Sequence, residues 1–278
     1  MLTTSLTVSR PSSSSTWNVT SPDHDRISEL ERSFRRAGLP TFVRGYSARR
    51  AFAKALPLLA IVFVLTTVYM RAGGGLDGIV SALLWATPVV LAAGVVAALI
   101  PVLVKWALMG RFREGERPLF SSFVWRNELA DTFAESLAVP GLIRLAVGSP
   151  VFNAWARLMG AKIERGVWCE TWWLPEFDLV HLGRGVSVNR GTVLQTHLFH
   201  DRIMRLQPVS MEAGSTLGPN SFVLPGSTVE AGATVGPGSL VMAQETVPAG
   251  STWGGNPIRP LHADVVGAVP AGGATRER

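Results

Sequence analysis

The sequence predicts a mainly β protein in which a parallel β-helix of hexapeptide repeats is preceded by a transmembrane helical hairpin. Three observations predict this fold class. Residues 211–252 divide into seven consecutive hexads, and residues 55–104 contain two long uncharged apolar runs. The mean hydropathy of +0.26, with 17% charged residues in a chain of 278, is too apolar for an ordinary soluble protein and directs attention to membrane segments.

The repeat is the stronger of the two sequence patterns. The hexads read MEAGST, LGPNSF, VLPGST, VEAGAT, VGPGSL, VMAQET and VPAGST. The first position is always aliphatic or Met, the fourth is usually Gly or Asn, and the fifth is usually Ser or Ala. A period of six is not helical. It fits a prism of triangular section in which each hexad forms one side, the aliphatic residue points inward and small residues occupy the corners.

Earlier hexads beginning at Ile163 and Leu182 extend the prism toward the N-terminus, which predicts a β-helix domain over residues 161–261 and a disordered tail over 262–278. The hexad phase breaks between Phe199 and Val209, where the chain inserts HDRIMRLQP. We expect this insertion to leave the prism as a loop. Loops that a rigid scaffold excludes are frequent sites of function.

The apolar runs predict two transmembrane helices within residues 48–110. Ala55–Met70 is uncharged for 16 residues, and Ile79–Val104 is uncharged for 26. A spanning helix needs about 20 apolar residues. Lys and Arg are more frequent on both flanks than in the short connection, so both flanks are predicted to be cytoplasmic. We therefore expect a bacterial-type cytoplasmic membrane protein whose catalytic domain faces the cytoplasm.

The remaining segments carry weaker signals. Residues 1–47 are predicted to be a disordered and juxtamembrane segment, because their start is rich in Ser and Thr. Residues 111–160 are predicted to form short connecting helices that either lie at the membrane surface or brace the β-helix. The single cysteine, Cys169, excludes an intrachain disulfide and fits a buried core position. The net charge of +6 lies largely beside apolar segments without a nucleic-acid-binding motif, so nucleic acid is not an expected partner.

Several quoted segments resemble known families. The hexads and the terminal WGGNPIRPL (253–261) resemble the left-handed β-helix acyltransferases of the hexapeptide-repeat family. RPLFSSFVWRNELADTF (117–133), GVWCETWWLPEFDLV (166–180) and VNRGTVLQTHLFHDRIM (188–204) are similar to the C-terminal region of nonribosomal peptide synthetases of the ε-polylysine type. Those synthetases carry paired membrane helices and tandem β-helix units. This chain shows one such unit and neither an adenylation domain nor a carrier serine motif.

The resemblance implies transfer of an acyl or aminoacyl group from a thioester to an amine or hydroxyl acceptor, with His197 as general base. The donor would be acetyl-CoA, another acyl-CoA or a phosphopantetheine-bound thioester, and no metal is expected. His200, three residues later, is the alternative base. Active sites of the family lie between neighbouring prisms, so a homotrimer is implied. A carrier protein and an adenylation enzyme are further candidate partners.

Other residues near the histidines are candidates for binding. Glu170 and Asp178 precede the histidine hexad and either orient the imidazole, bind a substrate ammonium or are merely exposed acids. His200, Asp201 and Arg202 either bind substrate or donor phosphates or fix the loop by an ion pair. Trp172 and Trp173 suit packing, a subunit interface or an aromatic wall for an acyl chain. The resemblance also assigns donor binding to a set in the last coil, whose alternative role is to lead the chain out of the prism: Gly254, Gly255, Asn256 and Arg259.

Two rival functions remain open at this stage. A zinc enzyme of the β-helix carbonic anhydrase type would use three histidines, for which His181, His197 and His200 are available. A membrane-tethered scaffold without catalysis would not depend on His197 at all.

Overall fold

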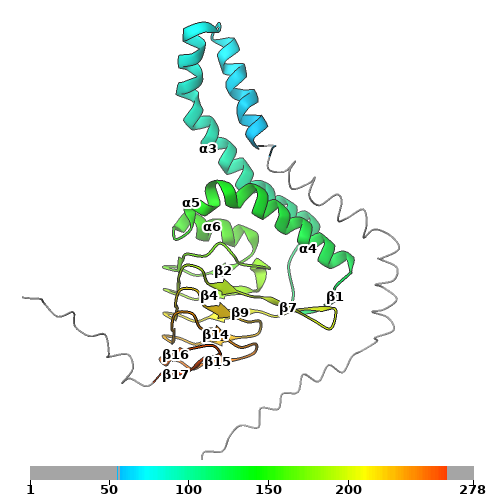
Figure 1. Cartoon of the computed structure of the whole chain (residues 1–278), viewed down its shortest axis with the longest axis vertical. Helices are drawn as coiled ribbons and strands as arrows, with labels where there is room; N and C mark the ends of the chain where they lie inside the picture. The colour runs from blue at the N-terminus through cyan, green and yellow to red at the C-terminus, as the bar shows by residue number, and fades with distance from the viewer. Residues whose placement is uncertain (1–54, 56, 262–278) are drawn as a thin grey trace, which may run out of the picture.

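The computed structural model describes residue 55 and residues 57–261, so the predicted segments 1–47 and 262–278 lie outside the described residues. Figure 1 shows two long helices at one end of the molecule, a layer of shorter helices in the middle and a stack of strands at the other end. The helices after the first apolar helix (Pro57–Arg71) are α3 (Gly75–Leu108), α4 (Ser122–Phe133), the π-helix η1 (Ala134–Ile143), α5 (Arg144–Ala146), α6 (Pro150–Met159) and the short 3-10 helix η2 (Phe177–Leu179).

The first apolar helix and α3 form a pair joined by a short turn. Tyr69 packs against Gly78, and its hydroxyl accepts a hydrogen bond from the backbone N–H of Gly75 at 3.2 Å. α3 is 34 residues long, which is about 51 Å of helix. It is the one helix in the described part of the chain that is long and apolar enough to cross a membrane, and Pro57–Arg71 is shorter. Length and composition alone are weak evidence, so the two membrane spans stay a prediction.

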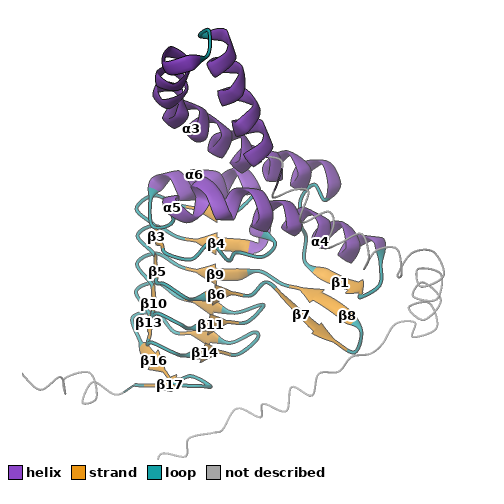
Figure 2. Ribbon diagram, turned by 45° about the horizontal axis from the view of Figure 1, so that its top comes forward, coloured by secondary structure: helices purple, strands orange, loops and turns teal. Residues whose placement is uncertain are grey.

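The strands build the predicted prism (Figure 2). Three parallel sheets form its faces, in the orders β2-β4-β9-β12-β15, β3-β5-β10-β13-β16 and β6-β11-β14. The strands are β2 (Lys162–Ile163), β3 (Trp168–Cys169), β4 (Val180–Leu182), β5 (Ser187–Val188), β6 (Val193–Leu194), β9 (Val209–Met211), β10 (Thr216–Leu217), β11 (Phe222–Val223), β12 (Thr228–Val229), β13 (Thr234–Val235), β14 (Leu240–Val241), β15 (Thr246–Val247) and β16 (Thr252–Gly254).

The first residue of each hexad faces the interior, as the repeat predicts. Met211, Leu217 and Val223 are at most 1% exposed, and Val229, Val235, Val241 and Val247 are fully buried. The fourth residue of each hexad adopts a positive φ and forms the corner, including the two non-glycine cases Asn220 (57°) and Gln244 (62°). Glycine occupies most of these positions because it adopts the positive φ of the corner without steric cost.

The insertion after Phe199 is more ordered than the loop predicted from the sequence. β7 (His197–His200) and β8 (Ile203–Leu206) form an antiparallel hairpin, and β1 (Gly115–Pro118) adds a third strand beside β8. Asp201 (φ 47°) and Arg202 (φ 64°) form its two-residue turn, because positive φ at both positions matches the twist of a hairpin. β1 lies within residues 111–160, the segment predicted to form short connecting helices.

The helical layer and the prism share one core. Phe152, Trp155 and Ala156 of α6 belong to the same buried cluster as the inward-facing residues of the coils, and so do Ala98 and Val102 of α3. The Trp155 indole donates to the Ala98 carbonyl at 2.8 Å. The helices of residues 111–160 therefore brace the end of the prism, and the apolar helix α3 is packed directly onto this brace.

Candidate active site

His197 lies where the chain leaves the prism. It is the first residue of β7 and follows β6 after only Gln195 and Thr196. The hexad pattern fixes Leu194 as an inward-facing residue, so the residues after it reach the corner where the hairpin begins. The His197 side chain is 17% exposed. The imidazole is thus held by the scaffold and still has one accessible side.

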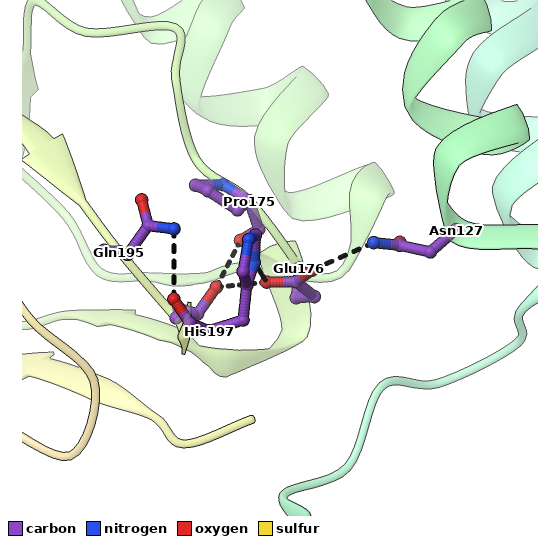
Figure 3. A network of polar contacts seen from close by, with 6 residues as sticks. Asn127, Pro175, Glu176, Gln195 and His197 are labelled. Carbon is purple, nitrogen blue, oxygen red and sulfur yellow. Dashed lines mark hydrogen bonds and ion pairs between the residues drawn. The ribbon is translucent and has the colours of Figure 1, made fainter. Parts of the chain in front are cut away.

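A buried carboxylate holds one nitrogen of this ring. Glu176 Oε2 lies 2.8 Å from His197 Nδ1, and the Glu176 side chain is fully buried (Figure 3). The Thr196 hydroxyl lies 2.6 Å from the same oxygen, and the Asn127 amide donates to Oε1 at 3.0 Å. An ionised carboxylate only accepts hydrogen bonds. In a pair of an ionised Glu176 and a neutral imidazole, Nδ1 donates to the carboxylate and Nε2 is the basic nitrogen.

The sequence analysis named Glu170 and Asp178, and not Glu176, as the acids that could orient the imidazole. The structure places Glu176 and neither of those two acids against the imidazole. The coils after the hairpin pair residues 18 apart, as in Thr216 with Thr234. The first two coils pair residues 19 apart, as in Ile163 with Leu182, and the side chains of Glu176 and His197 meet across an offset of 21. Glu176 itself has φ 29° and ψ 70°, a conformation that a non-glycine residue adopts at a cost.

Asp178 has a structural role instead. Its carboxylate lies 2.6 Å from the Lys105 ammonium near the end of α3, and both side chains are almost fully buried. It also accepts a hydrogen bond from the backbone N–H of Phe112. Glu170 follows β3, and its backbone N–H donates to Val188 in the next coil. Asp178 therefore anchors the segment that carries Glu176 to the helical layer.

A cavity of about 170 Å³ opens beside His197. Trp172 and Trp173 line it, with their rings in an edge-to-face arrangement 5.2 Å apart. Its acidic wall comes from α4 and the start of η1, where three acidic residues that line the cavity recur at helical spacing: Glu128, Asp131 and Glu135. Burial, followed by the negative charges of Glu176, Glu128 and Glu135, raises the pKa of Asp131 well above its usual range. The sequence analysis missed this wall, although the three- and four-residue spacing of its acids on one helix face was a signal.

The residues at the hairpin tip lie apart from the dyad of His197 and Glu176. His200 Nδ1 and Asp201 Oδ2 are 3.1 Å apart, and both side chains are about two-thirds exposed. They line a second cavity of about 240 Å³ together with Phe199. Arg202 is the second residue of the turn. His200 and Asp201 are thus close enough to interact with each other and also line a cavity, so both alternatives for these residues stay predictions.

The glycines nominated for donor binding lie in the last coil. Gly254 ends β16, which forms a short antiparallel pair with β17 (Arg259–Pro260), and Gly255 in the turn has φ 102°. Asn256 follows in the same turn. β16 lies three coils beyond β5, and β5 and β6 share the coil that precedes His197. Within one protomer the structure therefore does not bring this set next to His197.

The histidines counted toward a zinc site do not meet. His181 lies on β4, in a different face of the prism from β6, and its Nδ1 is 3.4 Å from the Ser210 hydroxyl. Burial and the neighbouring Lys162 lower the pKa of His181. In residues 57–261 no three or more His, Cys, Asp or Glu side chains are arranged to hold a metal ion.

Part of the chain is similar to a known synthetase. The chain is 35% identical over 136 residues to the delta-poly-L-ornithine synthetase of Acinetobacter baumannii (strain AB307-0294), a match that covers 49% of this chain and 10% of that protein. No protein-family model matches the chain.

Solved structures that align with it include a hexapeptide-repeat acetyltransferase from Vibrio cholerae, which is 16% identical with a TM-score of 0.32 over 43% of this chain and 85% of that chain. A maltose O-acetyltransferase from Clostridium difficile 630 is 16% identical with a TM-score of 0.29 over 39% of this chain and 72% of that chain. The sequence match confirms the resemblance to polyamino-acid synthetases: this chain is similar to a segment that spans about a tenth of such a synthetase.

Proposed function

We propose that the chain is a membrane-anchored acyltransferase that moves an acyl or aminoacyl group from a thioester to an amine, with His197 as general base. The observation that carries the proposal is the pairing of His197 Nδ1 with the buried Glu176 carboxylate at the edge of a cavity. A base must reach the proton of its nucleophile and hold the correct tautomer. The hydrogen bond to the Glu176 carboxylate selects the tautomer in which Nε2 is unprotonated, and the cavity has room for the nucleophile.

The chemistry requires one proton relay. The amine nitrogen attacks the thioester carbonyl while His197 Nε2 accepts a proton from that nitrogen. The C–S bond then breaks, and the imidazolium returns the proton to the departing thiolate, so that an amide and a free thiol result. The Glu176 carboxylate stabilises the imidazolium throughout, as the acid of a catalytic triad does. General base catalysis of this kind contributes about 10² to 10⁴ in rate.

The acidic wall supports an acceptor that has a second amino group, positively charged, in addition to the amine that reacts. Glu128, Asp131 and Glu135 line the cavity together with Trp172 and Trp173. Carboxylates and aromatic faces both attract ammonium groups. The matched relative is named for a polymer of ornithine, whose monomer has two amino groups. We propose that one ammonium rests against the acidic wall while the other amine, deprotonated, reacts beside His197.

The thioester donor is coenzyme A or the phosphopantetheine of a carrier protein. Gly254, Gly255, Asn256 and Arg259 are the proposed donor-binding residues. They lie three coils from His197, which is roughly 14 Å along the prism axis. A donor bound near the last coil must therefore extend toward His197 along a prism surface, either of the same protomer or of its neighbour.

The proposed assembly is a homotrimer anchored by two membrane spans. One prism face presents an apolar row outward, in which Phe222 pairs with Val193 on one side and Leu240 on the other. The outward positions of the other faces are mostly Ser and Thr, such as Thr216 and Thr234. The apolar face continues into the hairpin that His197 begins. This continuity supports a subunit contact beside the active site, and the helix Pro57–Arg71 preceding α3 supports a second span.

The full-length chain, purified in detergent, tests the proposal. It is incubated with acetyl-CoA or aminoacyl-carrier thioesters and with ornithine, lysine or a neutral amine, and amide formation is measured by mass spectrometry. We expect transfer to the diamines, lost by at least tenfold in His197→Ala and retained in the matched hairpin variant His200→Ala. Absence of transfer from every thioester would contradict the proposal and favour a scaffold. Full activity of His197→Ala would contradict the role of His197 as the base.

A further inference from the structure

We infer that Asn127 is a positioning residue that aims the Glu176 carboxylate at His197 from the helical layer. The inference rests on the proposed function, because it assigns Asn127 a role in the same dyad. Its basis is that the three groups around the carboxylate come from separate parts of the chain: Asn127 from α4, Glu176 from the irregular coil, and Thr196 with His197 from the start of the hairpin (Figure 3).

The carboxylate is fixed through both of its oxygens. Oε2 faces His197 and the Thr196 hydroxyl, whereas Oε1 receives the Asn127 amide at 3.0 Å. Both Asn127 and Glu176 are only 2% exposed. A buried carboxylate depends on hydrogen-bond donors in place of water. Without the amide of Asn127, Oε1 would lack a direct donor, and the carboxylate would be free to rotate away from the imidazole.

Asn127 is an energetically unfavourable residue for its position in α4, apart from its bond to Glu176. It lies inside α4, where Asn is less favourable than Leu. Its Oδ1 is buried without a hydrogen-bond partner within the described part of the chain. An apolar residue of the same shape would avoid both costs. The one favourable polar interaction that the structure gives this side chain is the bond to Glu176.

The bond also ties the dyad to α3. The neighbouring Arg126 donates to the carbonyl of Leu108, the last residue of α3, at 3.2 Å. On the other side of Glu176, Asp178 pairs with Lys105 of the same helix. The orientation of the Glu176 carboxylate therefore depends on how the helical layer packs on the prism. A positioning role through Asn127 makes the orientation of the base sensitive to the seating of α3.

The test compares two buried asparagines in the full-length protein. Asn127→Leu removes the bond to Glu176, whereas the matched control Asn153→Leu removes a bond to the backbone carbonyl of Val167 and leaves the dyad untouched. Asn153 is also buried with an unpartnered Oδ1. We expect Asn127→Leu to lower kcat by about tenfold, the scale of a modest loss in base catalysis, with little change in KM. Asn153→Leu should keep the kcat of the wild type per folded molecule.

Two further readouts separate positioning from a structural role. In the Glu176→Gln background, Asn127→Leu should cause no further loss of kcat, because the residue acts through the carboxylate. In addition, ¹⁵N shifts of labelled histidine report which ring nitrogen of His197 carries the proton, with His197→Ala identifying the resonance. Asn127→Leu should shift that tautomer toward the state of Glu176→Gln.

The nitrogen shifts need no substrate, so they test the inference even if no thioester is a donor. An unchanged kcat and tautomer in Asn127→Leu would overturn the inference, as would an equal loss of kcat in both Glu176 backgrounds. If Asn127→Leu does not fold, the same measurements on Asn127→Ala decide the question.

Discussion

At the scale of single residues, the proposed chemistry depends on one carboxylate that water does not reach. Glu176 is buried, contacts His197 Nδ1 at 2.8 Å and is held in an unfavourable backbone conformation. Backbone strain of this kind persists only where the surrounding structure over-determines it. The contacts with Thr196 and Asn127 supply that constraint.

Glu176→Gln tests the role of the charge while keeping the size of the side chain. The amide cannot stabilise an imidazolium as a carboxylate does, so we expect kcat to fall by about 10² or more. KM should change little, because the side chain is fully buried and does not line the cavity. Steady-state kinetics of the purified variant checks this. Wild-type kcat in Glu176→Gln would remove the carboxylate from the mechanism.

Asp131 gives the fold a dependence on pH. Burial, with the negative charges around it, raises its pKa in the folded state, whereas the unfolded value is about 3.9. Between these two values the folded state binds more protons than the unfolded state, so stability falls as the pH rises through this window. Asp131→Asn should therefore flatten the decline of Tm above about pH 4. Thermal unfolding of both proteins from pH 4 to 8 measures it, and parallel curves would contradict the assignment.

The sequence located His197 but not its partner. The histidine follows a recognisable hexad, whereas Glu176 lies in the irregular segment where the period gives no register. A period of 18 counted back from His197 points to Leu179, next to the nominated Asp178, whereas the contact is with Glu176, 21 residues before His197. Register in a coil is set by the hydrogen bonds between coils, which a broken repeat does not encode locally.

At the scale of elements, one ion pair joins the apolar helix to the coil that carries the base's partner. Lys105 of α3 and Asp178 of η2 lie 2.6 Å apart and are almost fully buried. The sequence predicted α3 from its long uncharged apolar run and the prism from the period of its hexads. It did not predict the β7–β8 hairpin, because that sheet is completed by β1, about 90 residues earlier in the chain.

Lys105→Met would leave the Asp178 carboxylate buried without its counter-ion. Breaking one side of a buried pair typically costs about 3 to 5 kcal/mol, so we expect a marked loss of stability in denaturant or thermal unfolding. The double variant Lys105→Met/Asp178→Leu should recover much of the loss, since an apolar pair of similar volume needs no counter-charge. A double variant as unstable as the single one would show that the pair is not an isolated electrostatic unit.

At the scale of the whole molecule, a helical layer links an apolar hairpin of helices to a rigid prism, and the candidate site lies at their junction. The cavity takes its acidic residues from α4 and η1 and its tryptophans and His197 from the prism segment. Neither part alone contains both walls. Because the apolar prism face leads into the His197 hairpin, the proposed trimer would close this junction further.

Phe222→Glu tests that assembly. Phe222 projects from β11 between Val193 and Leu240 and is 47% exposed. A carboxylate there should oppose burial in an apolar subunit contact. We expect light scattering in detergent to show monomers for Phe222→Glu and trimers for the wild type. Thr234→Glu, at an outward position of another face, is the matched control and should leave the assembly intact. Trimers in both variants would place the interface elsewhere.

The spacing of the coils also restricts which insertions and deletions this protein can tolerate in evolution. Residues stacked on one another are 18 apart in the regular coils, as Thr216 is with Thr234, Phe222 with Leu240, and Thr228 with Thr246. Loss or gain of one hexad would turn every later residue by one face and move Gly254 and Arg259 to another side of the prism. Loss or gain of 18 residues would leave each on its own face. Duplications and deletions that preserve function are therefore expected in whole turns, so that evolution lengthens or shortens this scaffold in steps of 18 residues.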